Sequence, residues 1–300
     1  MIPLFDLHCD TLTTLYKNNY LFENAPTHIS KNKASIYSPY IQICAIWSDF
    51  REDNEEAFNS YSSCLNFLKA SNFSFSTAVS PSSALLLSVE GARILNNRIE
   101  RLYSLYNDGV RLITLSWKDS DCIGGGWNTT APLTLFGKEV VKKCAELGIA
   151  IDMSHSSLAS QKEVIKMAHN IGFSPIYSHS NSFSVCPHDR NVKDDLAKEI
   201  VKLNGLIGIS LCSNHLHLTK EADLETIVSH IEHFLTIGCE NILSLGCDFD
   251  GTDILPRGIK DVTDLTKLYF LVTKKFGDIF AKKLFFENAF NYFSKHLERR

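Results

Sequence analysis

The sequence predicts an α/β protein built as a (β/α)8 TIM barrel, amidohydrolase-like, with an extra C-terminal helix. Eight short aliphatic or β-branched runs alternate with longer amphipathic stretches along the 300 residues, which is the pattern of this barrel. No run is followed by a G-x-G-x-x-G or Walker-type loop, so the usual reason to prefer a doubly wound open sheet is missing. The glycine run at 124–126 lacks the spacing of a phosphate-binding loop and is expected to be a flexible loop.

The strands and helices follow from the two hydrophobic periods. Predicted strands span residues 3–9, 40–47, 84–90, 111–117, 149–155, 175–180, 206–213 and 242–248. Predicted helices span residues 53–71, 93–107, 133–147, 157–171, 193–204, 222–238, 261–275 and 278–297. In the helix over 133–147, Val140, Cys144 and Leu147 recur at helical spacing and Gly148 can terminate it. No linker interrupts the pattern, so a single domain is expected over residues 1–300.

Composition and charge narrow the classes of function. A net charge of −4 disfavours nucleic acid and anionic membranes as partners, because both select basic surfaces. The nine cysteines are scattered, odd in number and without C-x-x-C spacing, which indicates neither a disulfide framework nor a structural zinc site. With no signal peptide and no apolar run near the ~18 residues of a membrane span, a cytoplasmic protein without a membrane partner is expected.

The first ten residues, MIPLFDLHCD, illustrate the chemistry of the predicted barrel. A strand sends alternate side chains to opposite faces. This period predicts an apolar face of Phe5, Leu7 and Cys9 and an ionisable face of Asp6, His8 and Asp10. Asp6 is expected one step beneath His8, as a carboxylate that supports the residues above it.

Ionisable side chains end five of the eight predicted strands, and in a barrel these ends form one rim. Taken singly, each has an ordinary explanation, such as a turn carboxylate or a hydrogen-bonded histidine. Burying all of them unpaired would cost several kcal/mol for each group, and a shared metal removes that cost. The residues are His8, Asp10, Glu90, His155, His179, Asp248 and Asp250.

The donor set indicates which metal and how many ions. Imidazole and carboxylate ligands without thiolate suit Zn²⁺ and, less selectively, Mn²⁺, Co²⁺ or Fe²⁺. Three histidines and three carboxylates exceed the three protein ligands of one catalytic zinc, so two ions sharing a carboxylate fit better. Two ions ~3.5–4 Å apart can activate a water and polarise the bond to be cleaved, which predicts a hydrolase.

Seven motifs then occur in order along the chain. They are DLHCDTL (6–12), SVEGA (88–92), LTLFGKEVV (133–141), LGIAIDMSH (147–155), SHSNSFSV (178–185), RNV (190–192) and GCDFDG (246–251). With these motifs the sequence resembles the membrane (renal) dipeptidase family of zinc metallopeptidases, as a bacterial-type soluble member. The resemblance implies a metallo-dipeptidase in which a hydroxide bridging two zinc ions attacks the peptide bond. It further implies that dipeptides with a C-terminal D-residue are accepted.

The resemblance also implies a role for each matched metal ligand. His8 and Asp10 look like ligands of the first zinc ion, and Glu90 looks like the carboxylate that bridges the two ions. His155 and His179 look like ligands of the second zinc ion. A homodimer is expected from the resemblance alone.

Three further residues are assigned around the metals. Asp248 resembles the residue that orients the bridging water and passes its proton to the leaving amine. Arg190 resembles the arginine that pairs with the terminal carboxylate of the dipeptide, which a guanidinium matches bidentately. Mammalian members carry a histidine after the fourth strand where this sequence places Trp117, whose indole can donate a hydrogen bond but cannot exchange a proton. Trp117 is therefore expected on the substrate side, with oxyanion stabilisation left to the metals or with an altered substrate range.

The remaining histidines receive simpler interpretations. Five are expected at the surface: His28, His169, His230, His233 and His296. Three are weighed as contacts on the substrate side: His188, His215 and His217.

Two alternatives remain open from the sequence. A related binuclear amidohydrolase could act on a non-peptide amide or lactam, and such an enzyme would depend little on Arg190. A catalytically silent barrel that binds a metal or peptide is the other, although the complete set of ligand residues argues against it.

Overall fold

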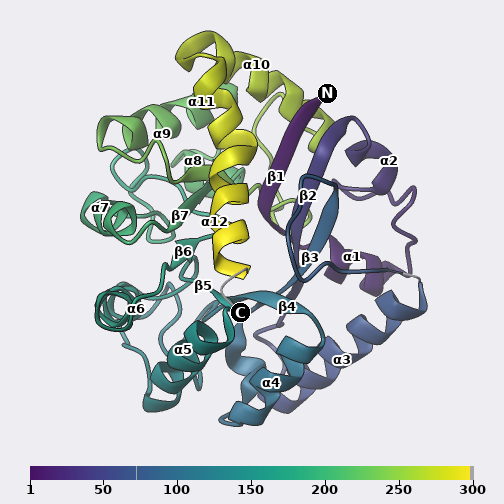
Figure 1. Ribbon diagram of the computed structural model, residues 1–300, viewed down its shortest axis with the longest axis vertical. Coiled ribbons are helices and arrows are strands. Elements are labelled where there is room, and N and C mark those ends of the chain that lie inside the picture. The colour runs from purple at the N-terminus through teal and green to yellow at the C-terminus, as the bar shows by residue number, and fades with distance from the viewer. Residues whose placement is uncertain (72, 298–300) are drawn as a thin grey trace.

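The computed structural model describes residues 1–71 and 73–297. Its eight strands form a closed parallel barrel in chain order, with β1 pairing with β8 between Asp6 and Leu245 (Figure 1). The predicted (β/α)8 barrel is confirmed, and the open doubly wound sheet is excluded. The strands are β1 (Ile2–Cys9), β2 (Tyr37–Trp47), β3 (Ala84–Glu90), β4 (Val110–Thr114), β5 (Ala150–Asp152), β6 (Ile176–Tyr177), β7 (Leu206–Ile209) and β8 (Leu243–Leu245).

The helices surround the barrel close to their predicted positions. Those that match a single prediction are α3 (Asn54–Ala70), α5 (Leu135–Leu147), α6 (Leu158–Ile171), α7 (Asp194–Lys202) and α9 (Leu224–Thr236). Thr134 caps the start of α5 by accepting a hydrogen bond from the Gly137 backbone N–H, and Gly148 ends it in the left-handed conformation, with φ of 65°.

Two of the predicted helices are each divided into two shorter ones, and three short helices were not predicted from the sequence. The helix expected over 93–107 is divided into η1 (Ala92–Leu95) and α4 (Ile99–Asn107), and the one over 261–275 into η2 (Val262–Asp264) and α10 (Leu265–Phe276). The C-terminal helix consists of α11 (Asp278–Lys282), the π-helical turn η3 (Lys283–Glu287) and α12 (Asn288–Leu297). Three short helices were not predicted: α1 (Thr11–Asn18), α2 (Lys31–Ala34) and α8 (Ser213–Leu216).

The strands β4 to β8 end earlier than predicted. His155, His179 and Asp248 were placed within strands, but each lies two or three residues beyond the last residue of its strand. Asp248 has a φ of 60°, in the left-handed region, which an extended strand cannot contain. His155, His179 and Asp248 therefore lie on loops that leave the barrel, whereas His8 and Glu90 lie at the ends of β1 and β3.

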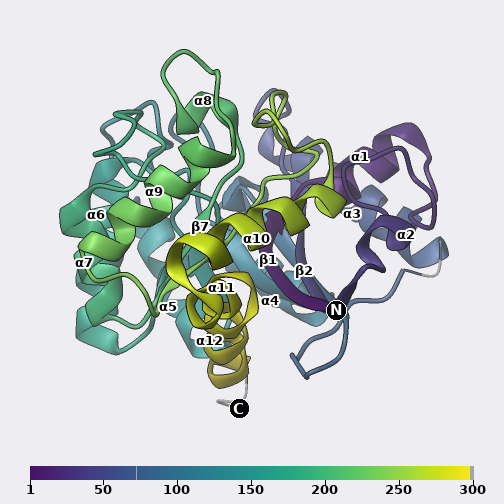
Figure 2. The same ribbon diagram turned by 90° about the horizontal axis from the view of Figure 1, so that it is seen from above.

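The amino-terminal end of the barrel is filled with apolar side chains. Phe5 stacks on Phe293 of α12 with ring centroids 5.4 Å apart, and α12 runs across this end of the barrel in Figure 1 and is seen nearly end-on in Figure 2. Each of seven strands supplies at least one buried side chain to this cluster, an arrangement that only the barrel interior allows. From the strands, the cluster contains Phe5, Leu7, Ile41, Ile43, Leu86, Leu112, Ala150, Ile176 and Leu206, and from α12 it contains Ala289, Tyr292 and Phe293.

The first strand departs from the predicted alternation. Phe5 and Leu7 belong to the interior cluster, whereas Cys9 belongs to the layer between the strands and the helices. The register of β1 against β2 shifts between Asp6 and Cys9, and this irregularity breaks the period of two. The expectation that Phe5, Leu7 and Cys9 share one face was therefore wrong beyond Leu7.

The glycine run at 124–126 is not the flexible loop that was predicted. All three residues are buried, and a Cβ on Gly126 would lie 2.6 Å from the backbone carbonyl carbon of Lys118. Glycine is required there because another backbone segment packs against it.

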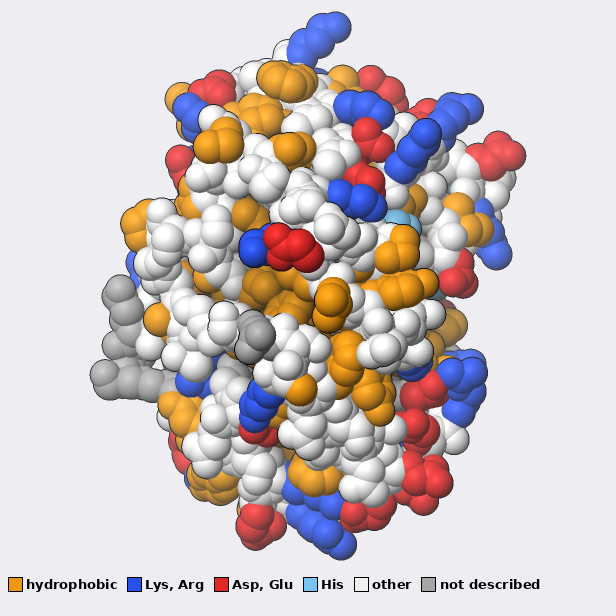
Figure 3. Space-filling model, turned by 90° about the vertical axis from the view of Figure 1, so that its right-hand side faces the viewer, with side chains coloured by type: hydrophobic (Ala, Val, Ile, Leu, Met, Phe, Trp, Pro, Cys, Tyr) orange, Lys and Arg blue, Asp and Glu red, His pale blue; other side chains and the backbone are white. Residues whose placement is uncertain are grey.

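One side of the molecule shows a band of hydrophobic side chains between charged groups of both signs (Figure 3). Among the helices of the described residues, none combines the length and apolarity needed to cross a bilayer.

Candidate metal centre

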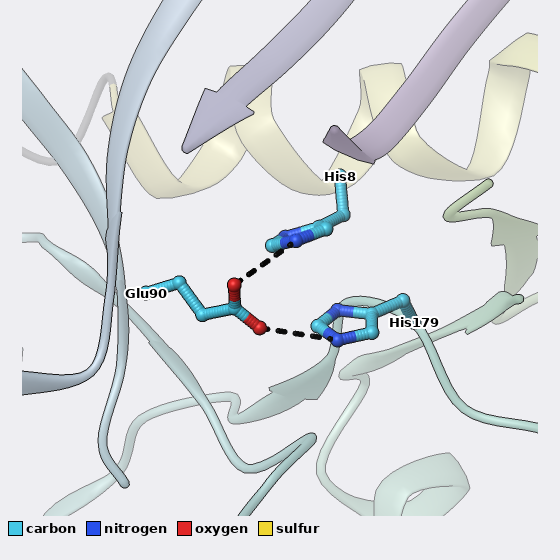
Figure 4. A group of neighbouring side chains, drawn as sticks. All are labelled: His8, Glu90 and His179. Carbon is cyan, nitrogen blue, oxygen red and sulfur yellow. Dashed lines mark ion pairs between the residues drawn. The ribbon is translucent and has the colours of Figure 1, made fainter. Parts of the chain in front are cut away.

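Glu90, the last residue of β3, lies at the centre of the rim. Its Oε2 lies 3.7 Å from Nε2 of His8, while its Oε1 lies 2.9 Å from Nε2 of His155 and 3.5 Å from Nε2 of His179. Figure 4 shows the carboxylate between the imidazoles of His8 and His179. The two oxygens of Glu90 thus face two different groups of potential ligands, and the side chain is only 3% exposed.

The group around His8 contains two more carboxylates. Nε2 of His8 lies 3.4 Å from Oδ2 of Asp10 and 3.8 Å from Oδ1 of Asp248. Two triads have ligand atoms within 4.8 Å of one another: His8 with Glu90 and His179, and His8 with Asp10 and Asp248. Each triad has the spacing that a single cation requires.

Burial and like charges leave these carboxylates in need of a cation. Burial, followed by the charge of Asp10, raises the pKa of Glu90 well above its ordinary value. Burial raises the pKa of Asp248 to about 7. Burial opposes a charge on His8, but the carboxylates of Glu90, Asp10 and Asp248 outweigh it and raise the pKa of His8 to about 10. The site favours positive charge at its centre.

The other two histidines are held neutral. Burial lowers the pKa of both His155 and His179 well below the ordinary value, and the positive charge of Arg190 acts in the same direction. A neutral imidazole offers a nitrogen lone pair to a metal. Within the described ranges, Nε2 of His8 and Oδ1 of Asp10 are buried and make no hydrogen bond. Neutral imidazoles, carboxylates and unpaired donor atoms together fit a divalent cation of the zinc type.

Comparison with known proteins agrees with this donor set. The sequence profile of the family described as membrane dipeptidase (peptidase family M19) matches residues 1–297. The chain belongs to the membrane dipeptidase family.

Solved structures of similar fold span almost the whole chain. A metallopeptidase from Rhodobacter sphaeroides, bound to a phosphinate mimic of the dipeptide L-Ala-D-Ala, is 21% identical with a TM-score of 0.89, covering 99% of each chain. A metallopeptidase of family M19 named dipeptidase AC is 22% identical with a TM-score of 0.89, covering 99% of this chain and 98% of its own. The probable dipeptidase PvdM from Pseudomonas aeruginosa is 16% identical with a TM-score of 0.86, covering 100% of this chain and 96% of its own. At these identities the likeness shows a common fold.

A cavity of about 380 Å³ opens above the ligand groups at the carboxyl end of the barrel. It is lined by side chains from most of the loops that leave the strands. They are Asp10, Thr13, Thr14, Lys17, Trp47, Glu90, Trp117, Trp127, His155, Arg190, Cys212, His215, Asp248 and Asp250, with the backbone of Gly251.

Arg190 extends into this cavity from the loop after β6 and is 4% exposed. One terminal nitrogen lies 2.8 Å from Nε2 of His155, and the other donates a hydrogen bond to the backbone carbonyl of Ser154. Its Nε has no hydrogen-bond partner among the described residues. A buried guanidinium with an unused donor beside the ligand groups is suited to bind an anion.

Trp117 lies beside the ligand groups, on the loop after β4. Its ring stacks on His155 at a centroid distance of 5.5 Å and on Phe50 at 5.0 Å, and it meets Trp47 edge-on at 5.4 Å. These rings make one wall of the cavity apolar, so a bound molecule would lose water on this side.

The histidines weighed as substrate-side contacts separate into two groups. His215 lines the cavity, and its ring lies 4.7 Å from that of His188, which in turn lies 5.9 Å from Trp127. His217 is exposed, and its Nδ1 lies 2.8 Å from the hydroxyl of Thr219.

Two histidines expected at the surface have structural roles. His230 is fully buried: its Nδ1 accepts a hydrogen bond from the Ser182 backbone N–H, and its Nε2 donates to the carbonyl of Leu216. The prediction for His230 was wrong because a helical histidine can face two loops at once. His28 is half-buried: its backbone N–H donates a hydrogen bond to Oδ1 of Asp250 (2.7 Å), and its Nδ1 accepts one from the backbone N–H of Asp250 (2.9 Å).

One buried carboxylate at the rim was not singled out from the sequence. Asp152 is the last residue of β5 and is fully buried, with donors from Thr114, Ser154 and Ser178 around it. The signal was present in IDMSH, where Asp152 ends an apolar run in the same way as Asp248 ends its own.

Proposed function

We propose that this chain is a dipeptidase that works with two zinc ions held at the mouth of its barrel. The two oxygens of Glu90 carry this proposal, because one faces His8 and the other faces His155 and His179. A carboxylate that faces two ligand groups at once is the arrangement expected of a bridging ligand. In this assignment His8 and Asp10 would hold the first ion, and His155 and His179 would hold the second. Glu90 would be shared by both ions.

When bound, two such ions lower the pKa of the attacking water and polarise the scissile carbonyl. Asp248 lines the cavity, and its Oδ1 lies 3.8 Å from Nε2 of His8, among the ligand groups. The burial that raises the pKa of Asp248 makes its carboxylate a better proton acceptor. Asp248 accordingly takes the proton of the water and delivers it to the departing amine.

Arg190 accounts for the length of the substrate. Its buried guanidinium lies 2.8 Å from Nε2 of His155, so a carboxylate paired with it would lie close to the ligand groups, as the terminal carboxylate of a short peptide does. The substrate class proposed is therefore dipeptides, including those with a C-terminal D-residue. The Rhodobacter sphaeroides protein bound to a mimic of L-Ala-D-Ala supports the D-residue part of the proposal. The aromatic wall around Trp117 contacts the substrate and excludes water from this side.

The proposal is tested by a dipeptide panel and metal analysis on one preparation. The full-length protein is stripped with a chelator, reloaded with Zn²⁺ and assayed on L,L- and L,D-dipeptides. We expect turnover of dipeptides, none of the corresponding amidated dipeptides or tripeptides, loss of activity on stripping and recovery at two equivalents of Zn²⁺. No turnover of any dipeptide by protein that holds two zinc ions would contradict the proposal. Hydrolysis of a lactam or non-peptide amide alone would instead establish the related amidohydrolase.

A further inference from the structure

Asp152, the last residue of β5, is fully buried and has no part in the chemistry proposed above. It accepts five hydrogen bonds. Its Oδ1 accepts from the backbone N–H of Ser154 (3.0 Å), the hydroxyl of Ser154 (2.6 Å) and the backbone N–H of Ser178 (2.8 Å). Its Oδ2 accepts from the hydroxyls of Thr114 and Ser178, both at 2.6 Å. A carboxylate bound on all sides in this way is fixed in position.

Ser178 connects this carboxylate to His179. The Ser178 Oγ lies 2.6 Å from Oδ2 of Asp152 and 2.7 Å from Nδ1 of His179. The Ser178 hydroxyl has one hydrogen, and a carboxylate can only accept, so this hydrogen is used toward Asp152. The same oxygen must then accept a hydrogen bond from Nδ1–H of His179.

This arrangement determines the tautomer of His179. With the proton on Nδ1, the lone pair is on Nε2, the nitrogen that lies 3.5 Å from Oε1 of Glu90 and 2.9 Å from Nε2 of His155. Metal-binding histidines are commonly oriented by an acceptor on their second nitrogen. Here the acceptor is a hydroxyl, which is itself oriented by the buried carboxylate.

The backbone around Ser178 is held as tightly as its side chain. A Cβ added to Gly208 or to Gly246 would overlap the carbonyl oxygen of Ser178, so β7 at Gly208 and the chain just after β8 at Gly246 approach it as bare backbone. By contrast, Nδ1 of His8 is buried with no hydrogen-bond partner in the described part of the chain. The two histidines are therefore prepared for a metal to different degrees.

We propose that Asp152 and Ser178 are positioning residues that hold His179 in its Nδ1–H tautomer, with Nε2 presented to the metal. The proposal rests on the proposed function only in taking His179 as a zinc ligand. The consequence is that His179 of the second site is oriented before a metal binds, whereas the described residues provide no such acceptor for Nδ1 of His8.

Two isosteric or near-isosteric variants separate this role from a general effect on packing. Ser178→Ala and Thr114→Val each remove one hydroxyl that donates to Oδ2 of Asp152, but only Ser178 contacts His179. The full-length chain, labelled with ¹⁵N-histidine and free of metal, is examined by long-range ¹H–¹⁵N NMR spectroscopy. Zn²⁺ affinity is measured on the same proteins by competition with a chelator, and thermal unfolding in excess chelator checks that both variants fold.

We expect His179 to be the Nδ1–H tautomer in the wild-type and Thr114→Val proteins, and a mixture of tautomers in Ser178→Ala. Zn²⁺ affinity at one of two sites should fall about 10- to 100-fold in Ser178→Ala and by less than about threefold in Thr114→Val. An Nε2–H tautomer in the wild-type protein, or equal losses of affinity in the two variants, would overturn the proposal. Because the NMR measurement needs no metal, it decides the role of Ser178 even if the chain binds no zinc.

Discussion

The two ends of the barrel are built from the same strands and have opposite chemistry. Toward the amino-terminal end, Leu112 and Ala150 belong to the apolar cluster closed by α12. Two residues further along the same strands, Thr114 and Asp152 face each other at a hydrogen-bond distance of 2.6 Å. On β3, two such steps lead from Leu86 through Ser88 to Glu90, and all three residues are buried.

The difference shows how one barrel divides stability and function. The amino-terminal end buries aliphatic and aromatic side chains against one another. The mouth buries carboxylates and imidazoles, and Nδ1 of His8 and Oδ1 of Asp10 have no hydrogen-bond partner among the described residues. Such groups destabilise a fold unless a ligand compensates them. We therefore expect substitutions at the mouth to alter activity and metal binding. Substitutions in the apolar cluster at the amino-terminal end should alter stability.

The largest effect is expected for Glu90→Gln. Loss of the bridging charge should lower kcat/KM for a dipeptide by about 10³-fold or more, equivalent to about 4 kcal/mol. The metal-free variant should be at least as stable as the wild-type protein, because a buried carboxylate near Asp10 has been removed. Steady-state kinetics and thermal unfolding in chelator measure the two quantities.

Ser88→Ala is the matched control, since it changes a buried polar side chain two residues earlier on β3. It should leave kcat/KM within a few fold of the wild-type value. If Glu90→Gln retained most of the activity, Glu90 would not be the bridging ligand.

The second largest effect is a loss of stability, expected in the apolar cluster at the amino-terminal end of the barrel. Phe293→Ala removes the ring that stacks on Phe5 and should lower the free energy of unfolding by about 3–4 kcal/mol. Chemical denaturation measures this loss, and the zinc content of the folded variant should be unchanged. Phe270→Ala on the exposed face of α10, where Phe270 is 65% exposed, should change stability by no more than about 0.5 kcal/mol. A Phe293→Ala protein of wild-type stability would show that α12 does not close the barrel in solution.

The sequence was most informative where a period or a spacing determines geometry. Eight strands, their order and the rim residues followed from alternation of hydrophobic runs, and Glu90 was correctly placed at the end of β3. The sequence was less informative where contacts between distant parts of the chain determine the register or the burial of a residue. The register irregularity in β1 depends on pairing with β2, and the burial of His230 depends on loops that are 14 and 48 residues away in the chain. The tight packing at 124–126 likewise depends on the backbone at Lys118.

The third effect is a pH dependence of the free energy of unfolding, which arises from His230 and its hydrogen bonds to Ser182 and Leu216. Burial lowers the pKa of His230 to about 4, from 6.5 in the unfolded chain. As the pH falls from about 6.5 to 4, the unfolded chain takes up a proton that the folded protein does not. His230 should therefore reduce the free energy of unfolding by up to ~3 kcal/mol across this range, and have no such effect above pH 7.

His230→Gln removes this titration and keeps a donor for the carbonyl of Leu216. We expect the variant to be less stable than the wild-type protein at pH 7 and the difference to narrow toward pH 5, as measured by chemical denaturation in chelator. His217→Gln, at an exposed position, serves as the control. A stability difference between His230→Gln and wild type that stays constant with pH would contradict the assignment.

The smallest effect is expected for Arg190→Ala. Loss of the charged hydrogen bonds to the dipeptide carboxylate should cost about 2 kcal/mol, seen as a rise of about 30-fold in KM with a smaller change in kcat. Arg257→Ala, which removes an exposed arginine paired with Asp223, should leave both constants unchanged. An unchanged KM in Arg190→Ala would favour a substrate without a carboxylate, as expected of an amidohydrolase that cleaves a non-peptide amide.

The central claim is that the mouth of the barrel holds two metal ions that share Glu90. The most direct test is a crystal of the zinc-loaded protein measured at the zinc absorption edge. We predict two anomalous peaks on either side of the Glu90 carboxylate, one beside His8 and Asp10 and the other beside His155 and His179. Ligand distances should be about 2.0–2.2 Å. A single peak, or peaks away from Glu90, would contradict the account.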